Sequence, residues 1–140
     1  MYLAVDIGGT KTLVATISDD GVIQEKHRFP TPKNYESLLQ SLREAAQEFK
    51  TKEFAGGGVG VPGHIDYEHG VSVNSPHVAW GHVPLRDDCA KIFGCQFVID
   101  NDANMAALSE AMLHKEFQTV LYFTVSTGIG TGLVRDRDGR

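Results

Sequence analysis

The N-terminal part of the chain alternates between apolar and polar positions in three short runs. Each run has the length and the period of two that are typical of a β-strand. Asp19-Asp20-Gly21 lies between the second run and the third and is a turn signal, so the pattern predicts an antiparallel meander. The predicted strands cover residues 2–6, 12–18 and 22–29.

Three later segments are predicted to form helices. The first begins after Asn34, a favourable N-cap residue, and closes near Lys50. The second begins at Pro84 and stops at Gly94, and the third, residues 101–114, has strong helix formers and an acidic start. Between them, residues 56–63 combine a brief apolar strand with a Pro-Gly turn, and residues 96–100 predict a short strand.

Residues 64–84 lack a helical pattern and are rich in histidine, glycine and proline. We predict a long loop with room for one short hairpin, and such a loop in a compact domain is usually functional or disordered. Trp80 in this loop is either buried in the core or part of a lid. We expect solvated side chains rather than a metal site at the histidines of this loop, which are His64, His69, His77 and His82.

The last predicted strands, residues 119–126 and 132–136, form a hairpin around a glycine-rich turn. The order βββαβαβα with this added hairpin predicts an α/β layer fold. Its mixed five-stranded sheet is flanked by helices, with the first three strands antiparallel and the later ones parallel. The hairpin would expose an apolar face and an unpaired edge, so we expect it to pair with another copy or to pack back on the domain.

Composition narrows the range of functions. The net charge of −5 comes from 18 acidic and 13 basic residues without a basic run, so we expect no nucleic-acid partner. No segment resembles a signal peptide or is long and apolar enough to span a membrane, so we expect a cytoplasmic protein with no membrane partner. Cys89 and Cys95 lack the spacing of a zinc or redox motif and are expected to be reduced core thiols.

The segment DIGGTK places a carboxylate, two glycines, a hydroxyl and a lysine in one tight turn between strands. Gly8 and Gly9 would let backbone N–H groups approach an anion, while Thr10 and Lys11 would add a hydroxyl and a positive charge. Asp6 at the strand end could hold a hydrated Mg²⁺. The alternative is an ordinary hairpin turn in which Asp6 caps the loop, and spacing alone does not separate the two.

STGIGTG at residues 126–132 is a second glycine-rich turn with hydroxyl side chains. Two such turns together favour a phosphate-binding role, although neither has the GK[ST] ending of a Walker A loop. The segment from Gly58 to Gly63 also fits GxGxxG. We reject a dinucleotide fingerprint there, because Pro62 and Gly63 lead into a loop and not into a helix.

VIDNDAN is the most informative cluster, because three polar residues follow a short apolar strand and open a helix. A ligand crevice in an open α/β sheet lies beyond the carboxyl ends of the strands. Asp102 could therefore accept a proton from a hydroxyl group that Asn101 orients, and the helix dipole would stabilise its carboxylate. The alternative is that Asp100, Asn101 and Asp102 only cap the helix.

Taken together, DIGGTK at 6–11, GVPG at 60–63, DNDAN at 100–104 and STGIGTG at 126–132 resemble the ROK family of repressors and sugar kinases. The order and spacing of the four segments match over essentially the whole chain. The resemblance implies the ribonuclease H-like, actin-like ATPase fold, with residues 1–118 as the sugar-binding first domain and 119–140 as the opening hairpin of a second. The motifs look most like those of bacterial N-acetylglucosamine kinase and glucokinase.

The resemblance also implies a role for each matching residue in an ATP- and Mg²⁺-dependent sugar kinase. Asp102 would be the catalytic base that activates the sugar hydroxyl, and Asp6 would lie near Mg²⁺ and hold it through water. The phosphates of ATP would lie against Asp6, Gly8, Gly9, Thr10, Lys11, Thr127, Gly128, Gly130, Thr131 and Gly132. The sugar would contact Pro62, Gly63, Asn74, His77, Asn101 and Asp102.

The chain departs from the family pattern in three places. SPHVAW puts His77 at or beside the position of a usual sugar-binding asparagine, with Asn74 as a possible substitute, and the second turn begins STG where GTG is usual. The family continues past the position of Arg140 with a sugar-binding and zinc-binding segment, so we expect a structural zinc downstream and a chain that is the N-terminal half of a kinase. The whole kinase would be a homodimer, and the half alone inactive.

Three other functions remain open. Family repressors carry a helix-turn-helix before the first strand, whereas here a strand begins directly after Met1, which disfavours a regulator. A nuclease of the ribonuclease H fold would use carboxylates such as Asp6 and Asp102 with two metals, but the acidic charge and the two glycine turns disfavour it. The last is a sugar-binding or interaction module without catalysis.

Overall fold

The computed structural model describes residues 1–125 and 128–135. The chain folds into two compact units, Met1–Asp100 and Asn101–Arg140, and each is described by itself. The expected division after residue 118 concerns the domains of a longer protein and stays a prediction. None of the helices in the described residues is both long enough and apolar enough to cross a membrane.

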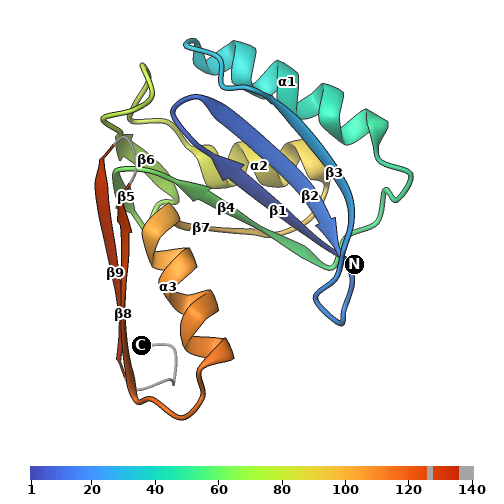
Figure 1. The fold of residues 1–140 in the computed structure, drawn as a ribbon. Coiled ribbons are helices and arrows are strands. Elements are labelled where there is room, and N and C mark those ends of the chain that lie inside the picture. Colours follow the sequence, from blue (N-terminus) through green and yellow to red (C-terminus); the bar gives the residue numbers. More distant parts are fainter. Residues whose placement is uncertain (126–127, 136–140) are drawn as a thin grey trace. The chain divides into compact units, whose positions relative to one another are not determined.

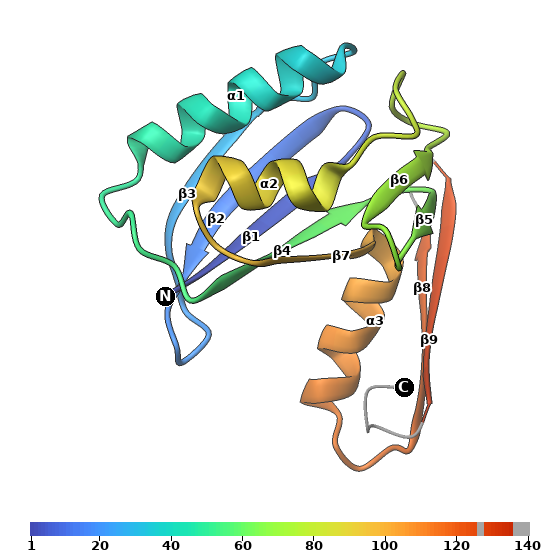
Figure 2. The ribbon, with the colours of Figure 1, turned by 180° about the vertical axis from the view of Figure 1, so that it is seen from behind.

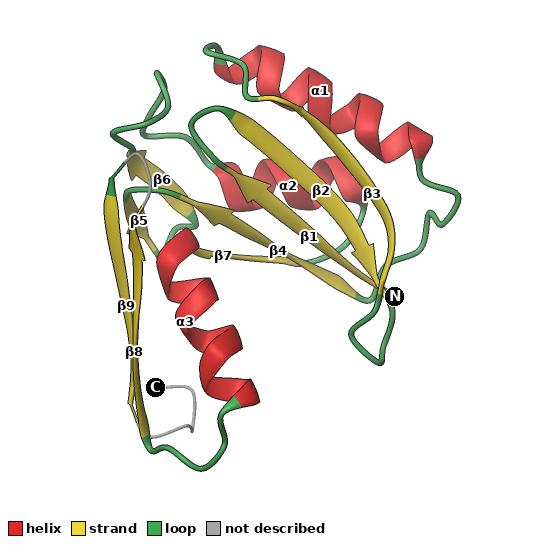
Figure 3. Cartoon of the chain, in the orientation of Figure 1, coloured by secondary structure: helices red, strands yellow, loops and turns green. Residues whose placement is uncertain are grey.

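A five-stranded sheet forms the centre of the first unit (Figures 1 and 3). Its strands are β1 (Tyr2–Ile7), β2 (Lys11–Ile17), β3 (Ile23–Pro30), β4 (Gly56–Val61) and β7 (Phe97–Asn101). Their order is β3-β2-β1-β4-β7. β2 pairs antiparallel with β1 and β3, and β1 pairs parallel with β4. The predicted meander and the mixed sheet are therefore confirmed.

Helices α1 (Tyr35–Glu48) and α2 (Leu85–Phe93) lie beside this sheet (Figure 2). Their apolar faces are buried in the core that the sheet forms. Asn34 is the N-cap of α1, because its side-chain oxygen accepts the N–H of Ser37 at 3.2 Å. Gly94 ends α2 in the left-handed conformation, with φ of 69°. The core takes one face of each strand and includes Leu3, Val5, Val14, Val59, Val61 and Ile99.

The segment between β4 and α2 contains a second, smaller sheet. β5 (His64–Asp66) and β6 (Val71–Asn74) form an antiparallel hairpin, so the predicted loop contains the short hairpin for which it had room. The chain then folds back, and Ser72 forms a β-bridge with Val83. Trp80 is 9% exposed, and its ring centroid lies 5.2 Å from that of Tyr35 on α1. Trp80 is therefore a core residue and not a lid aromatic.

Burial also sets the chemistry of three groups near α2. It raises the pKa of the Tyr35 hydroxyl, which the hydrogen bond to Asp88 at 2.9 Å raises further. It likewise raises the pKa of the Cys89 thiol, which is fully buried, and that of Cys95, which is partly buried. Both cysteines are free, so Cys89 is the core thiol that the sequence predicts and Cys95 lies at the edge of the core.

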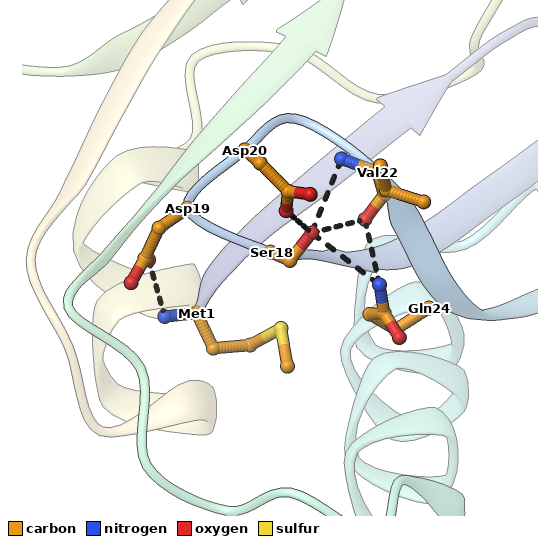
Figure 4. Close-up of polar contacts among 6 residues, drawn as sticks. All are labelled: Met1, Ser18, Asp19, Asp20, Val22 and Gln24. Carbon is orange, nitrogen blue, oxygen red and sulfur yellow. Dashed lines mark hydrogen bonds and ion pairs between the residues drawn. The ribbon is translucent and has the colours of Figure 1, made fainter.

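The turn between β2 and β3 is anchored by Ser18 (Figure 4). The Ser18 hydroxyl donates to the carbonyl oxygen of Val22 at 3.0 Å and accepts the N–H of Val22 at 3.2 Å. It also bonds to the carboxylate of Asp20, which lowers the pKa of that group. The N-terminal ammonium of Met1 pairs with Asp19 at 2.9 Å. The predicted turn is thus present and held by side chains as well as by backbone.

The second unit consists of helix α3 (Asp102–Leu113) and a hairpin of β8 (Thr119–Val125) and β9 (Ile129–Arg135). The hairpin packs on α3, so it covers the chain's own helix, one of the two predicted arrangements. The other face of the hairpin is apolar, and each of its five large side chains is more than half exposed. These are Leu121, Phe123, Val125, Ile129 and Leu133.

The observed hairpin differs from the predicted one where β9 packs closely on α3. β9 begins at Ile129 and not at residue 132, so Gly130 and Gly132 lie in the strand. A Cβ atom at Gly132 would lie 2.5 Å from the carbonyl oxygen of Ala103 and 2.6 Å from the Cβ of Ala107. The buried side of α3 is made of alanines, which allow this approach. Met112, on the same helix, is 64% exposed.

Candidate functional site

Asp6 lies on the face of the sheet opposite the two helices. Strand side chains alternate between faces, and its neighbours Val5 and Ile7 are buried in the core while Asp6 is exposed. Its backbone pairs with Leu13 of β2 and Gly60 of β4. The strand therefore presents the carboxylate on the open face, next to the turn that follows.

The turn of Gly8, Gly9, Thr10 and Lys11 has its backbone polar groups divided between two roles. The N–H of Gly8 donates to the carbonyl oxygen of Lys11 at 2.9 Å and closes the turn. Within the described part of the chain, the N–H groups of Gly9 and Thr10 have no hydrogen-bond partner, and both residues are exposed. Two unpaired donors, a hydroxyl and the exposed Lys11 ammonium at one tip can bind an anion.

Thr31 supports this turn and is a residue that the sequence did not indicate. Its hydroxyl donates to the carbonyl oxygen of Gly8 at 2.6 Å, and its N–H donates to the carbonyl oxygen of Thr10 at 3.0 Å. A further bond of 2.9 Å joins its hydroxyl to that of Thr12. Thr31 thus binds the carbonyl oxygens that would repel a phosphate. β2 pairs with β3 so that Lys11 lies opposite Pro30, which places Thr31 beside this turn. A prediction of that strand register would have identified Thr31.

Replacing Thr31 by valine is expected to lower the free energy of unfolding by about 1–3 kcal/mol, because the carbonyl of Gly8 loses its partner in a partly buried place. Urea unfolding of the purified chain measures this. Thr31→Ser keeps the hydroxyl and is the matched control, so it should stay near wild type. A valine variant as stable as the serine variant would contradict the role given to the hydroxyl.

On the sugar side, the structure brings Pro62, Gly63 and Asn74 together. Gly63 has φ of 104°, and a Cβ atom there would lie 2.1 Å from the carbonyl oxygen of Asn74 and 2.7 Å from the Cα of Ser75. Pro62 is buried beside it, whereas Asn74 is exposed at the end of β6. The turn after β4 therefore lies directly against the end of β6.

His77 lies against the turn of Gly8 to Lys11. A Cβ atom added at Gly9 would lie 2.7 Å from the Cβ of His77 and 2.9 Å from its carbonyl oxygen. His77 is itself exposed. One residue predicted for phosphate and one predicted for sugar are thus in direct contact within the first unit.

In the second unit, Asn101 and Asp102 begin α3. The side-chain oxygen of Asn101 accepts the N–H groups of Ala103 at 2.9 Å and Asn104 at 3.3 Å, so Asn101 is the N-cap. Asp102 is exposed in the first turn, and its carboxylate also accepts the N–H of Ala103 at 2.9 Å. The capping alternative therefore holds for Asn101, and Asp102 keeps its carboxylate at the surface of the helix N-terminus.

Asp100 ends the first unit and has a partner that the sequence did not indicate. The hydroxyl of Tyr67 donates to its carboxylate at 2.9 Å. Tyr67 follows β5, which is far from Asp100 along the chain. No spacing rule joins the two, because only the folded hairpin brings them together.

The residues of the second glycine-rich segment are placed differently from the prediction. Thr127 lies outside the described residues. Gly128 is exposed just before β9, whereas Gly130, Thr131 and Gly132 belong to that strand. Position 132 requires a glycine for packing, because a Cβ atom there would overlap the backbone of α3. A phosphate-binding role for these residues stays a prediction.

A hydrated magnesium ion is compatible with this set of residues. Mg²⁺ usually keeps several waters and takes one or two carboxylates together with the phosphates of its ligand. Asp6 supplies an exposed carboxylate of that kind. Across residues 1–125 and 128–135, no three histidine, cysteine or acidic side chains gather closely enough to hold a metal ion by themselves. A role of Asp6 at magnesium stays a prediction.

The ROK family model matches residues 2–138. The chain belongs to the ROK family. A ROK family glucokinase from Streptomyces griseus, solved in complex with glucose and AMPPNP, has a TM-score of 0.84 at 27% identity, over 99% of this chain and 46% of that one. The resemblance and the actin-like ATPase fold are therefore confirmed.

Two further ROK proteins frame the comparison. The N-acetyl-D-glucosamine kinase of Yersinia pestis bv. Antiqua (strain Nepal516) is 37% identical over 142 residues, which are 96% of this chain and 54% of that protein. A ROK family transcriptional regulator, a homologue of the E. coli MLC protein, has a TM-score of 0.85 at 19% identity over 97% of this chain and 37% of the regulator, which shows the fold alone. The chain spans about half the length of the curated relatives it matches.

Proposed function

We propose that this chain is the N-terminal part of an ATP-dependent sugar kinase that phosphorylates a hydroxyl group of a hexose or an N-acetylhexosamine. The observation that carries the proposal is the turn after β1. Its exposed N–H groups at Gly9 and Thr10 lack partners in the described chain, its carbonyls are bound by Thr31, and Asp6 precedes it. An ordinary hairpin turn needs none of these features.

The proposed roles follow from elementary chemistry. The turn would bind phosphate oxygens of ATP, and Asp6 would hold magnesium through water. Asp102 would accept the proton of the attacking hydroxyl, since its carboxylate is exposed in the first turn of α3 and within reach of a ligand from solvent. Phosphoryl transfer depends mostly on positioning and charge stabilisation, which the turns and the metal would supply.

The sugar would lie against Pro62, Gly63 and Asn74, with His77 close by. Asn74 offers an amide that can both donate to and accept from sugar hydroxyls. His77 at or beside the place of the usual asparagine would alter which hydroxyl or N-acetyl group is preferred. The relatives include kinases named for glucose and for N-acetyl-D-glucosamine, and these two sugars are the first to test.

Sugar binding and turnover of the purified chain test the proposal separately. Calorimetric titration with glucose and with N-acetylglucosamine is expected to show saturable binding of one of them. Asn74→Ala should weaken it at least about five-fold, through loss of a hydrogen bond made to an uncharged ligand. Gln24→Ala, on the exposed edge strand β3, is the control. Release of ADP from ATP should stay at background, and clear turnover would show that the chain is not merely part of a kinase.

A non-catalytic sugar-binding module or a sugar-responsive regulator is the alternative. We retain this alternative because a ROK family transcriptional regulator has the same fold. It shares the sugar site with the kinase proposal but has no need for a phosphate-binding turn. Saturable sugar binding together with no effect of Mg²⁺ and AMPPNP on the turn residues would favour this alternative.

A further inference from the structure

The contact between Gly9 and His77 joins two parts of the proposed site that are distant in the sequence. Gly9 is not in the left-handed region, so backbone conformation does not demand glycine there. The demand comes from space, since a Cβ atom would overlap both the side chain and the carbonyl oxygen of His77. Any shift of the turn at Gly9 must therefore be met by a shift of His77.

The segment that contains His77 is anchored on both sides. On one side, Asn74 and Ser75 lie against Gly63 with no room for a Cβ atom. On the other, the N–H of His82 donates to the carbonyl oxygen of Val73 at 2.8 Å. Trp80 is buried between these anchors. The segment around His77 is thus short and held at both ends. A displacement of His77 therefore cannot be absorbed by a long flexible loop.

We infer that the Gly9–His77 contact couples the two proposed ligand sites. A phosphate bound at the turn of Gly8 to Lys11 fixes the turn, the contact then fixes the segment around His77, and the sugar binds to a segment that is already ordered. A ligand that meets a pre-ordered site binds more tightly, because less conformational entropy is lost on binding. The inference rests on the proposed function, which supplies the two ligands.

Thermodynamic linkage gives the coupling a definite form. If nucleotide raises the affinity for sugar by some factor, sugar raises the affinity for nucleotide by the same factor. Couplings of this kind are usually five-fold or more. We therefore expect Mg²⁺ with AMPPNP to raise the affinity of the chain for its sugar at least about five-fold. Gly9→Ala, which pushes the turn and His77 apart, should reduce that factor to about one.

Adjacent glycines provide the matched control. A Cβ atom at Gly8 would meet the carbonyl oxygen of Lys11 at 3.1 Å and does not meet His77. Gly8→Ala thus disturbs the same turn without pressing on the sugar segment. Gly9→Ala is expected to weaken sugar binding in the absence of nucleotide, whereas Gly8→Ala should not. Gly56→Ala, with 3.6 Å of clearance to Gln96, reports on general effects of an added methyl group.

The experiment combines calorimetry with NMR of the His77 imidazole, whose resonance is assigned by its absence in His77→Gln. A sugar affinity that rises with Mg²⁺ and AMPPNP in wild type and Gly56→Ala, but not in Gly9→Ala, supports the coupling. Sugar binding that is indifferent to nucleotide in wild type, or that responds equally in Gly9→Ala and Gly56→Ala, overturns it and leaves the proposed function standing.

If neither glucose nor N-acetylglucosamine binds, the sugar part of the proposed function fails, and the NMR arm alone decides the coupling. Mg²⁺ and AMPPNP should then shift the His77 resonance in wild type and leave it in place in Gly9→Ala. No shift in wild type, or the same shift in both proteins, would show that the contact does not link the two sites.

Discussion

Under the proposed function, replacing Asp102 by asparagine in the longer kinase is expected to lower kcat by 10²–10⁴-fold, equivalent to about 3–5 kcal/mol of transition-state stabilisation. Asparagine keeps the size and the hydrogen-bonding oxygen of the side chain, so it still accepts the N–H of Ala103 that Asp102 accepts now. It cannot take up the proton of a sugar hydroxyl. Turnover should therefore fall while sugar affinity stays at the wild-type value. A coupled assay of ADP release, with calorimetric sugar titration beside it, measures both.

The control for Asp102 is another acidic residue of the same helix. Glu110 lies near the far end of α3 and pairs with His114 at 3.7 Å, so Glu110→Gln removes a carboxylate of α3 without touching the proposed chemistry. It should keep wild-type kcat. If Asp102→Asn loses sugar binding together with turnover, Asp102 is a binding residue and not the base. If it turns over at the wild-type rate, the catalytic proposal for Asp102 is wrong.

The order of the elements could be predicted from the sequence because each has a strong local signal. The meander follows from alternation, and Asn34 and Gly94 mark the ends of helices at the positions where the structure has them. The family resemblance rests on four short segments, and the match over residues 2–138 confirms it. Local chemistry was sufficient for these features.

Contacts between distant segments could not be predicted in this way. Gly9 was interpreted as a donor site for an anion, and the structure adds that the space at its Cα is filled by His77. Gly132 was interpreted as part of a phosphate loop, and the structure adds that its neighbour is the backbone of α3. Glycine has the same local signature whether a ligand or another segment of the protein approaches it. Only the folded structure distinguishes the two.

The candidate site shows the same limit for polar residues. Asn101 was given two roles, and the two N–H groups that it caps support the structural one without excluding a sugar contact by its amide group. Thr31 went unnoticed because its partners, Gly8 and Thr10, belong to a different turn. Strand register brings them together, and register depends on the pairing of whole strands. A sequence pattern identifies residues that can do chemistry more readily than the residues that hold them in place.

Replacing Gly63 by alanine is expected to be the most destabilising single methyl addition in the first unit. The residue has φ of 104°, which L-residues with a side chain rarely adopt, and the new Cβ atom would lie 2.1 Å from the carbonyl oxygen of Asn74. The obstructing atom is backbone and cannot rotate away. Strain and overlap together should lower the free energy of unfolding by about 3–5 kcal/mol, a large share of the 5–15 kcal/mol typical of a domain. Urea unfolding followed by circular dichroism measures the loss.

Gly21 separates the two causes, because it has a similar backbone conformation in open space. Its φ is 82°, and no atom lies within 4 Å of a Cβ atom built there. Gly21→Ala should therefore cost only the backbone strain, about 1–2 kcal/mol. If Gly63→Ala is no less stable than Gly21→Ala, the contact between the turn after β4 and the end of β6 is loose enough to accept a methyl group. If the difference exceeds about 2 kcal/mol, the overlap with Asn74 dominates and the sugar side of the proposed site is built on a rigid junction.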